Sequence, residues 1–194
     1  MHNQHTSQQQ HNQRAPGAQA TSDAIPSVFV VRAERRGEAE ETDLRDGVCS
    51  IGWHDTPNPF YHTKAEIEAY GATHWLDEQG KTAPDAPKMI WHFAHAPELN
   101  QAIIVLPRLH PQHRGEVLLG RCHSTAYWDY DAAGTDESPR LRRRMHWSDI
   151  VLQWEDFSEQ TQNWFRGAQH TVTPARQVVV AQDIAAHAAA LALL

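Results

Sequence analysis

The chain has 194 residues, the length of one ordinary domain or at most two small ones. It carries 17 Lys and Arg against 24 Asp and Glu, a formal net charge of −7 that argues against coating nucleic acid through bulk charge. Seven Trp and fourteen His are the unusual features of its composition. No apolar stretch approaches the roughly 18 residues of a membrane span, no secretory signal is visible, and two cysteines are too few for a disulfide framework. We therefore expect a cytoplasmic protein without membrane contact.

The first part of the chain differs in composition from the rest. Gln, Asn, His, Ser and small residues dominate residues 1–27, which cannot bury enough apolar area to offset their ordering entropy. We expect a disordered polar tail over residues 1–27 and a single folded domain over residues 28–194. The run VFVV at 28–31 predicts the first buried strand.

Strand and helix signals then alternate irregularly. A charged helix is expected over 36–46, and the pattern T-x-x-E from Thr63 to Glu66 is a capping box that predicts a helix to about Leu76. The other predicted elements are strands at 48–53, 102–106, 116–127 and 145–152, a helix from Pro87 or Lys88 to His95, and an alanine-rich helix from Asp183 to Leu193. Short strands mixed with helices, without regular βαβ alternation, indicate an α+β fold, and the strand spacing allows a small closed or half-closed barrel.

Catalytic motifs are missing from the sequence. The chain has no dinucleotide-binding glycine pattern, P-loop, nucleophile elbow or H-E-x-x-H motif. His92 and His95 can face one side of a helix, but the sequence assigns no third ligand for a zinc ion. Cys49 and Cys122 lie within predicted strands and are expected to be buried, inert thiols. The sequence therefore predicts no enzyme, no cofactor and no metal site.

Four arginines lie within five residues, at Arg140, Arg142, Arg143 and Arg144. In a strand the first, second and fourth share one face, and planar guanidinium groups suit phosphate oxygens. The alternative is a solvated strand edge whose charge prevents pairing with another sheet.

Aromatic residues cluster near the expected strand ends and loop mouths, with Trp53 after a strand, Trp91 on a helix, Trp128 after the long strand and Trp147 after the arginine run. Such residues can stack a base extracted from a duplex. Core packing is the alternative for each Trp taken singly, because Trp is usually largely buried.

A series of short motifs occurs in a set order between about Val28 and Thr173. They are Val31-Arg32-Ala33, Gly37-Glu38, Ile51-Gly52-Trp53, Trp91-x-Phe93, Ile104-Val105-Leu106-Pro107, Gly120-Arg121-Cys122, Tyr127-Trp128-Asp129-Tyr130, and Arg143-Arg144 with Trp147. The series resembles the N-terminal domain of Mrr-type restriction endonucleases, an EVE-like member of the PUA superfamily. The resemblance implies a small, strongly bent β-barrel with flanking helices that reads nucleic acid. It implies that Trp53 and Trp91 are walls of a base pocket and that Arg32 is a polar group near the pocket. It also implies that Arg142, Arg143 and Arg144 contact the nucleic-acid backbone.

Two departures from the family pattern bear on this expectation. Asn100-Gln101 stands where the family usually carries Gly-Asp, so the turn there must be built differently. The 21 residues after Thr173 are too few for the nuclease domain of the Mrr enzymes. If the protein takes part in DNA cleavage, a separate nuclease partner must cut.

The leading hypothesis is a nucleic-acid-binding module of a bacterial or phage restriction system, which reads a modified or plain base flipped into an aromatic pocket. DNA is favoured over RNA. The candidate pocket residues are Trp53, Trp91, Arg32, Trp128 and Trp147, and the candidate phosphate-binding residues are Arg140, Arg142, Arg143 and Arg144. The alternative is a protein-interaction or small-molecule-binding protein on the same fold, which the charge of −7 favours. The alanine-rich helix can cap the barrel or pair with a second copy, so a homodimer is left open.

Overall fold

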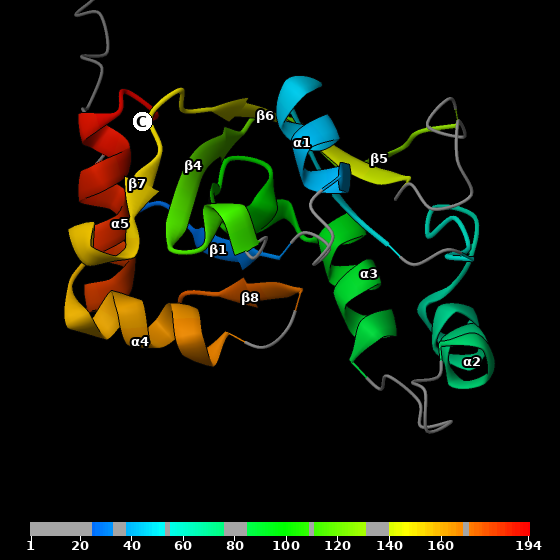
Figure 1. The fold of residues 1–194 in the computed structure, drawn as a ribbon. Helices are drawn as coiled ribbons and strands as arrows, with labels where there is room; N and C mark the ends of the chain where they lie inside the picture. The colour runs from blue at the N-terminus through cyan, green and yellow to red at the C-terminus, as the bar shows by residue number, and fades with distance from the viewer. Residues whose placement is uncertain are drawn as a thin grey trace, which may run out of the picture.

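The fold is built on one strongly curled sheet that has helices against both faces (Figure 1). This computed structural model describes residues 25–32, 38–52, 55–75, 85–108, 111–130, 140–168 and 171–194. The strands are β1 (Val28–Val31), β2 (Val48–Ile51), β3 (Ile103–Pro107), β4 (Glu116–Cys122), β5 (Tyr127–Trp128), β6 (Leu141–Trp147), β7 (Leu152–Gln153) and β8 (Val172–Pro174). The α-helices are α1 (Glu38–Arg45), α2 (Lys64–His74), α3 (Ala86–His95), α4 (Glu159–Gly167) and α5 (Val178–Ala190). The predicted α+β class, a bent half-barrel with flanking helices, is confirmed.

The strands follow the order β2-β6-β4-β3-β1-β8, while β5 pairs with β6 and β7 with β4 outside this path. β1 and β3 are parallel, and the other described pairs are antiparallel. One edge of β4 changes partner along its length: Glu116 lies opposite Gln153 of β7, and Cys122 lies opposite Met145 of β6. This change of partner accompanies the curl of the sheet.

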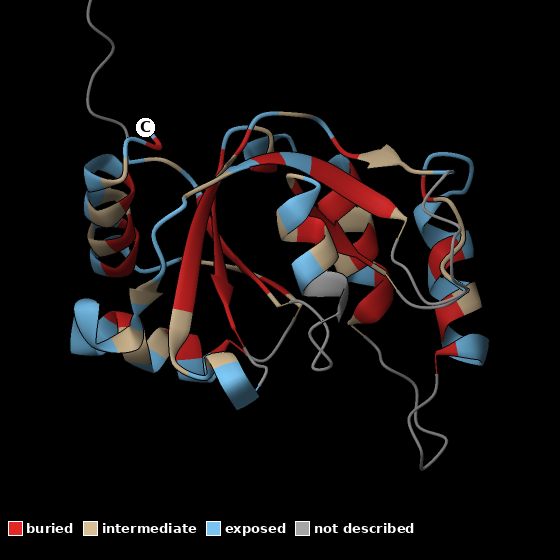
Figure 2. Cartoon of the chain, turned by 45° about the horizontal axis from the view of Figure 1, so that its top comes forward, coloured by how far each residue is buried: buried red, intermediate tan, exposed pale blue. Residues whose placement is uncertain are grey.

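β1 is buried on both faces because the sheet separates two cores. Phe29 and Val31 belong to the core under α2 and α3, whereas Val28 and Val30 belong to the core under α4 and α5. Figure 2 shows the strands of the sheet largely buried and the outer faces of the helices exposed. A strand covered on both faces requires apolar residues at every position, which explains the unbroken run at 28–31.

The predictions for the first half of the chain are confirmed, with bounds shifted by a few residues. The clearest case is the capping box of α2, where the Glu66 amide donates to Thr63 Oγ1 at 3.3 Å and the Thr63 amide donates to a Glu66 carboxylate oxygen at 2.7 Å. The expected strands at 28–31, 48–53 and 102–106 and the helix ending at His95 are present as β1, β2, β3 and α3. The predicted disordered tail lies outside the described residues from 1 to 24.

Several predictions for the second half are wrong. The strand expected over 116–127 ends at Cys122, and the strand expected over 145–152 occupies 141–147, so that Arg142, Arg143 and Arg144 lie inside it. The last helix begins at Val178 rather than at Asp183, because Val180 and Ala181 extend its buried face. The sequence analysis also misses α4 and β8, whose apolar patterns are too short to stand out.

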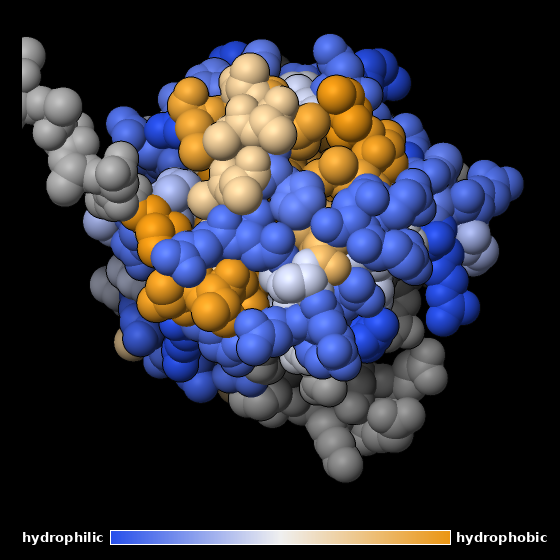
Figure 3. Space-filling model, turned by 90° about the vertical axis from the view of Figure 1, so that its left-hand side faces the viewer, coloured by the Kyte–Doolittle hydropathy of each residue, from blue (hydrophilic) through white to orange (hydrophobic). Residues whose placement is uncertain are grey.

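The last helix covers the sheet, as one of the two alternatives for it predicts. Val180, Ala181, Ile184 and Ala188 are its buried residues. Figure 3 faces the side of the molecule that carries α4 and α5, and it shows separate apolar areas divided by polar ones. The exposed apolar residues on or next to β7 and α5 are Ile150, Val151, Val178, Val179 and Leu194. Pairing of this side with a second copy stays a prediction.

Arg143 joins β6 to the end of α3 from inside the fold, and only 1% of the residue is exposed. Its guanidinium donates to the Phe93 carbonyl at 2.9 and 2.6 Å, to the Ala96 carbonyl at 3.3 Å, to Asn100 Oδ1 at 2.7 Å and to the Ser124 carbonyl at 3.1 Å. Carbonyls in the last turn of a helix lack partners within the helix, and a cation there also interacts favourably with the negative end of the helix dipole. Burial lowers the pKa of this guanidinium, which stays charged at neutral pH because arginine starts so high. Arg143 therefore caps α3.

Arg143→Ala is expected to lower the free energy of unfolding by about 3 kcal/mol or more, because several buried carbonyl groups lose their donors. The matched control is Arg144→Ala, since Arg144 is the next residue of the same strand and is exposed. That change is expected to cost at most about 1 kcal/mol. Urea denaturation measures both, and similar small losses in the two variants would contradict the capping role.

Gly120 of β4 is required by the ring that lies over it. Trp147 stands opposite Gly120 in the ladder, and a Cβ at position 120 would lie 2.4 Å from Trp147 Cε3. The ring is held in place because its Nε1 donates to the Val48 carbonyl at 3.0 Å. An added methyl group must therefore displace a fixed ring.

Gly120→Ala is expected to reduce the free energy of unfolding by about 1–3 kcal/mol through overpacking. Gly167→Ala is the control, because nothing lies within 4 Å of a Cβ at that position. It is expected to leave stability unchanged or to raise it by up to about 1 kcal/mol. Thermal unfolding of the two variants tests this, and a Gly120→Ala protein as stable as the parent would rule out the close approach.

Candidate functional site

A cleft of about 740 Å³ lies at the edge of the sheet formed by β8. Its walls come from the start of α2, the first half of α3, the end of α4 and β8 with the residues after it. A volume between about 300 and 1,000 Å³ is typical of sites for small ligands or single chemical groups. The lining residues are Lys64, Asp85, Lys88, Met89, Trp91, His92, Trp164, Val172, Thr173, Pro174, Arg176 and Gln177.

Two tryptophans from opposite sides of the sheet line this cleft. Trp91 is half-buried on α3 and packs against the core under α2 and α3, with its ring centroid 4.0 Å from that of His95. Trp164 is half-buried on α4 and packs against the other core, with its ring centroid 5.7 Å from that of Phe165. Because Phe93 and Phe165 are fully buried next to these residues in sequence, each helix is fixed and each indole has a defined position.

The edge strand β8 contributes Val172, Thr173 and Pro174 to the lining of the cleft. β8 pairs with β1 on one side, with Thr173 opposite Val30, and ends the described sheet on the other. Pro174 has no amide hydrogen, and a proline on an edge strand discourages pairing with another strand. The cleft is therefore shaped to take up a side group or a small molecule rather than an added β-strand.

The rim of the cleft is locally positive on an acidic chain. Lys64, Lys88 and Arg176 line it, against one lining carboxylate, Asp85, which lies 3.1 Å from Lys88 Nζ. Lys64 also lies 3.8 Å from a Glu68 oxygen. Three cations beside two indoles suit a ligand that has both a flat aromatic part and a negative charge.

The structure places one of the predicted pocket residues in this cleft. Trp91 lines it, whereas Arg32 is not among the lining residues; Arg32 follows β1, and its Nη2 donates to the Phe165 carbonyl at 2.7 Å. Trp128 and Trp147 instead pack against the core under α2 and α3. Trp53 lies outside the described residues. A pocket role for these residues stays a prediction.

Sequence reasoning misses Trp164 and the three cations of the rim. Trp164 belongs to α4, which the sequence analysis does not recognise as a helix, and Arg176 lies in the link from β8 to α5. The pair Trp164-Phe165 between polar neighbours is a local signal, because two large rings in an otherwise polar stretch indicate a face that packs against a core.

The arginine run lies on β6, away from this cleft, and its four members differ in exposure. Arg143 is buried at the end of α3, and Arg142 is 8% exposed with Nη1 2.9 Å from Asp129 Oδ2. Arg144 is exposed, with its Cζ 5.6 Å from the centre of the Tyr127 ring, and Arg140 is half-buried before the strand. The pairing of β5 with β6 explains the burial of Arg142, because β5 covers that part of the strand. Phosphate binding stays a prediction for Arg140 and Arg144, whereas Arg142 and Arg143 are engaged within the fold.

The histidines and cysteines show no sign of a metal centre in the part of the chain that is described. His92 Nε2 lies 3.8 Å from a Glu98 oxygen, and His95 Nε2 lies 3.2 Å from the Pro59 carbonyl oxygen. No group of three His, Cys, Asp or Glu side chains among the described residues is arranged to hold a metal ion. Cys49 and Cys122 are buried free thiols, as predicted, and burial raises the pKa of Cys49 well above its ordinary value.

Comparison with known proteins adds no assignment: no family model matches the chain, and no curated protein or solved structure is significantly similar to it. Within the described ranges, no helix is both long enough and apolar enough to cross a membrane.

The carboxyl group of Asp43 is buried and bonded to Ser50, which lies opposite Arg142 in the sheet. Asp43 of α1 is 8% exposed, and its Oδ2 accepts hydrogen bonds from the Ser50 amide at 2.8 Å and from Ser50 Oγ. Burial raises the pKa of Asp43 to about 6, and the Ser50 hydrogen bonds and the charge of Arg142 oppose this rise only in part. The native state therefore holds the Asp43 proton more tightly than the unfolded chain does.

This shift predicts a pH dependence of stability with a definite sign. Between the ordinary pKa of 3.8 and about 6, the native state binds more protons, so the free energy of unfolding falls as pH rises and levels off above about pH 6. The contribution is on the order of 3 kcal/mol. Asp43→Asn keeps an oxygen acceptor for Ser50 but carries no titratable group. Urea midpoints between about pH 4 and 7 should show this fall in the parent and not in the variant, and equal slopes would refute the assignment.

Proposed function

We propose that the protein binds a nucleic acid and holds one of its bases in the cleft between Trp91 and Trp164. The observation that carries this proposal is that two half-buried indoles and three cations line the same cleft, although the chain as a whole is acidic. A base stacked on an aromatic side chain contributes about 1–3 kcal/mol, and every base offers a face for stacking. Lys64, Lys88 and Arg176 are then positioned for the phosphates next to the bound base.

The architecture supports a relationship to the PUA superfamily. A curled half-barrel with flanking helices agrees with the fold that the resemblance to EVE-like domains implies, and in that family a flipped base is held in an aromatic-walled pocket. We extend the proposal accordingly to a reader of a plain or modified base, with DNA favoured over RNA, in a bacterial or phage restriction setting. On this proposal any strand cleavage belongs to a separate nuclease partner.

The second candidate function is binding of a free small molecule. The volume of the cleft suits a mononucleotide as well as a base within a strand, and the net charge of −7 disfavours long-range attraction of a polymer. The two functions differ in what the phosphates of neighbouring nucleotides contribute. If a mononucleotide binds as tightly as an oligonucleotide, the small-molecule function is the correct one.

The proposal predicts that Trp91→Ala and Trp164→Ala each weaken binding of a fluorescently labelled single-stranded or mismatched DNA by about 1–3 kcal/mol, measured by fluorescence anisotropy at low salt. Lys88→Ala and Arg176→Ala should weaken binding and reduce the slope of log affinity against log salt by about 0.7 each. Both are exposed, so loss of folding does not confuse their result.

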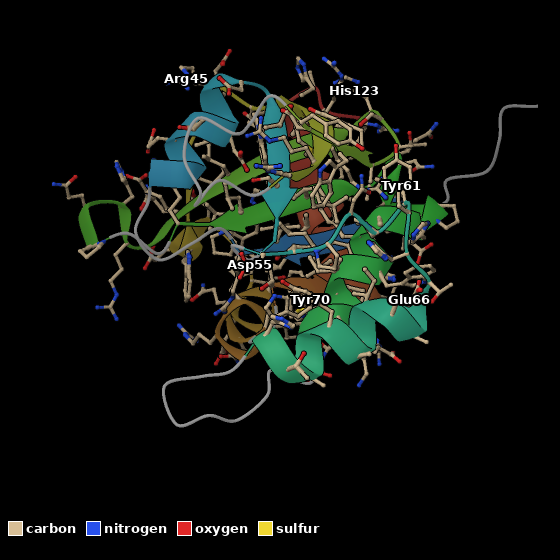
Figure 4. The ribbon with its side chains drawn as sticks, turned by 90° about the vertical axis from the view of Figure 1, so that its right-hand side faces the viewer. Arg45, Asp55, Tyr61, Glu66, Tyr70 and His123 are labelled. Atoms are coloured by element: carbon tan, nitrogen blue, oxygen red, sulfur yellow. The ribbon has the colours of Figure 1, made fainter. Side chains whose placement is uncertain are left out.

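Arg45→Ala is the matched control for Lys88→Ala. Both side chains are exposed and paired with a nearby carboxylate, but Arg45 lies on α1, at the opposite side of the molecule from α2 (Figure 4). It should leave affinity and salt slope unchanged. Absence of binding to any DNA or RNA at low salt would contradict the proposal. If the Arg45 and Lys88 variants lose the same affinity, the nucleic acid does not contact the protein specifically at the cleft.

A further inference from the structure

Aromatic side chains continue from Trp91 along the surface, away from the cleft. The rings of Trp91, His95 and Phe60 follow one another. Tyr61 is next to Phe60 in sequence, and Tyr130 is joined to the same segment through Asn58. We call Trp91, His95, Phe60, Tyr61 and Tyr130 the aromatic row. Trp91 and His95 are one turn apart on α3, with ring centroids separated by 4.0 Å. The Phe60 ring meets the His95 ring edge to face, with centroids 5.5 Å apart.

The outer end of the row is held by hydrogen bonds between distant parts of the chain. Asn58 Nδ2 donates to the Tyr130 hydroxyl at 3.1 Å, and Asn58 Oδ1 accepts from the Phe60 amide at 3.0 Å. The Tyr61 side chain raises the pKa of Tyr130, so the two side chains lie close together. Tyr130 follows β5 and is 72 residues from Asn58, so tertiary structure, and not sequence proximity, brings the two tyrosines together.

These outer rings are exposed, unlike most of the aromatic residues of the chain. The exposed fractions are 40% for Phe60, 76% for Tyr61 and 58% for Tyr130. In Figure 4, Tyr61 lies in the loop before α2, at the margin of the molecule and on the same side as Glu66. A ring that is fixed by hydrogen bonds yet open to solvent can stack with a flat ligand without first being ordered.

One cation of the cleft rim lies close in sequence to the aromatic row. Lys64, which lines the cleft, comes three residues after Tyr61 at the start of α2. The nearest acidic group along this segment, the Glu66 carboxylate, accepts hydrogen bonds from the Thr63 amide at 2.7 Å and the Thr63 hydroxyl at 3.0 Å, so it is held against the helix N-terminus. A positive cleft that continues into exposed, fixed rings is the pattern of a site for unpaired bases and their backbone.

We infer that the aromatic row is a track for the bases that follow the one in the cleft, so that the ligand is a single-stranded oligonucleotide segment rather than a duplex or a free nucleotide. This inference rests on the proposed function. Unpaired bases expose both faces to the rings, whereas paired and stacked bases in a duplex do not. The row thus sets a ligand length of several nucleotides, within the range of about 4–16 that single-strand-binding domains occupy.

The test compares a labelled DNA dinucleotide, a single-stranded octamer and the octamer duplex by fluorescence anisotropy. The full-length protein is expected to bind the octamer about tenfold more tightly than the dinucleotide or the duplex. Tyr61→Ala and Tyr130→Ala should each weaken octamer binding about tenfold and leave dinucleotide binding unchanged. Tyr61→Phe and Tyr130→Phe keep the rings but lose the hydroxyl groups that help to hold them, so they should weaken octamer binding less than the two alanine variants do.

The outcomes separate this inference from the function on which it rests. If Trp91→Ala weakens octamer binding while the two tyrosine-to-alanine variants do not, the inference about the aromatic row is wrong and the proposed base site in the cleft is still supported. If affinity does not rise from dinucleotide to octamer, or the duplex binds as well as the single strand, the track is also wrong. Binding of none of the three ligands overturns the proposed function itself.

Discussion

The bonds from Arg143 to the end of α3 are the constraint on which the rest of the site depends. One guanidinium on β6 donates to carbonyl groups of Phe93 and Ala96 and also to Asn100 and Ser124. A charged group so deeply buried is stable only if nearly all its donors are used, and its planar fork defines direction as well as distance. The end of α3 is thereby fixed against the sheet. Trp91 and His95 are carried on that helix, so a buried cation sets where the proposed binding surface lies.

The cleft exists because the sheet ends where its two helical layers meet. α2 and α3 cover one face and α4 and α5 the other, and β8 is the last described strand between them. Each layer presents one half-buried indole at that edge, because a helix that buries Phe93 or Phe165 must turn a neighbouring residue outward. Residues of β8 then form part of the lining. The two indoles of this cleft are half-buried, as is usual for tryptophan, whereas the carboxyl group of Asp43 is a polar group that burial disfavours.

Local patterns in the sequence are sufficient to predict an element when the residues that determine it lie within that element. The VFVV strand follows from burial on both faces, and the capping box of α2 depends only on Thr63 and Glu66. The arginine run is the opposite case. The four arginines of the run are alike in sequence, yet two are buried, because α3 supplies carbonyls to Arg143 and Asp129 supplies a carboxylate to Arg142. Trp164 and Arg176 were missed for the same reason: their roles depend on α4, β8 and α3 coming together.

On the proposed function, the charge of −7 restricts how a nucleic acid can bind. An acidic body gives weak long-range attraction, so sequence-independent coating of the phosphate backbone is suppressed. Affinity must then come from short-range contacts at places where cations and aromatic faces coincide. The described cleft with Lys64, Lys88 and Arg176 is such a place, and the aromatic row extends from it. A binder of this kind loses little to competing duplex, since stacking on Trp91 and Tyr61 requires bases that are already unpaired or can be flipped. On the proposed function, the acidic surface is thus a source of selectivity for such bases.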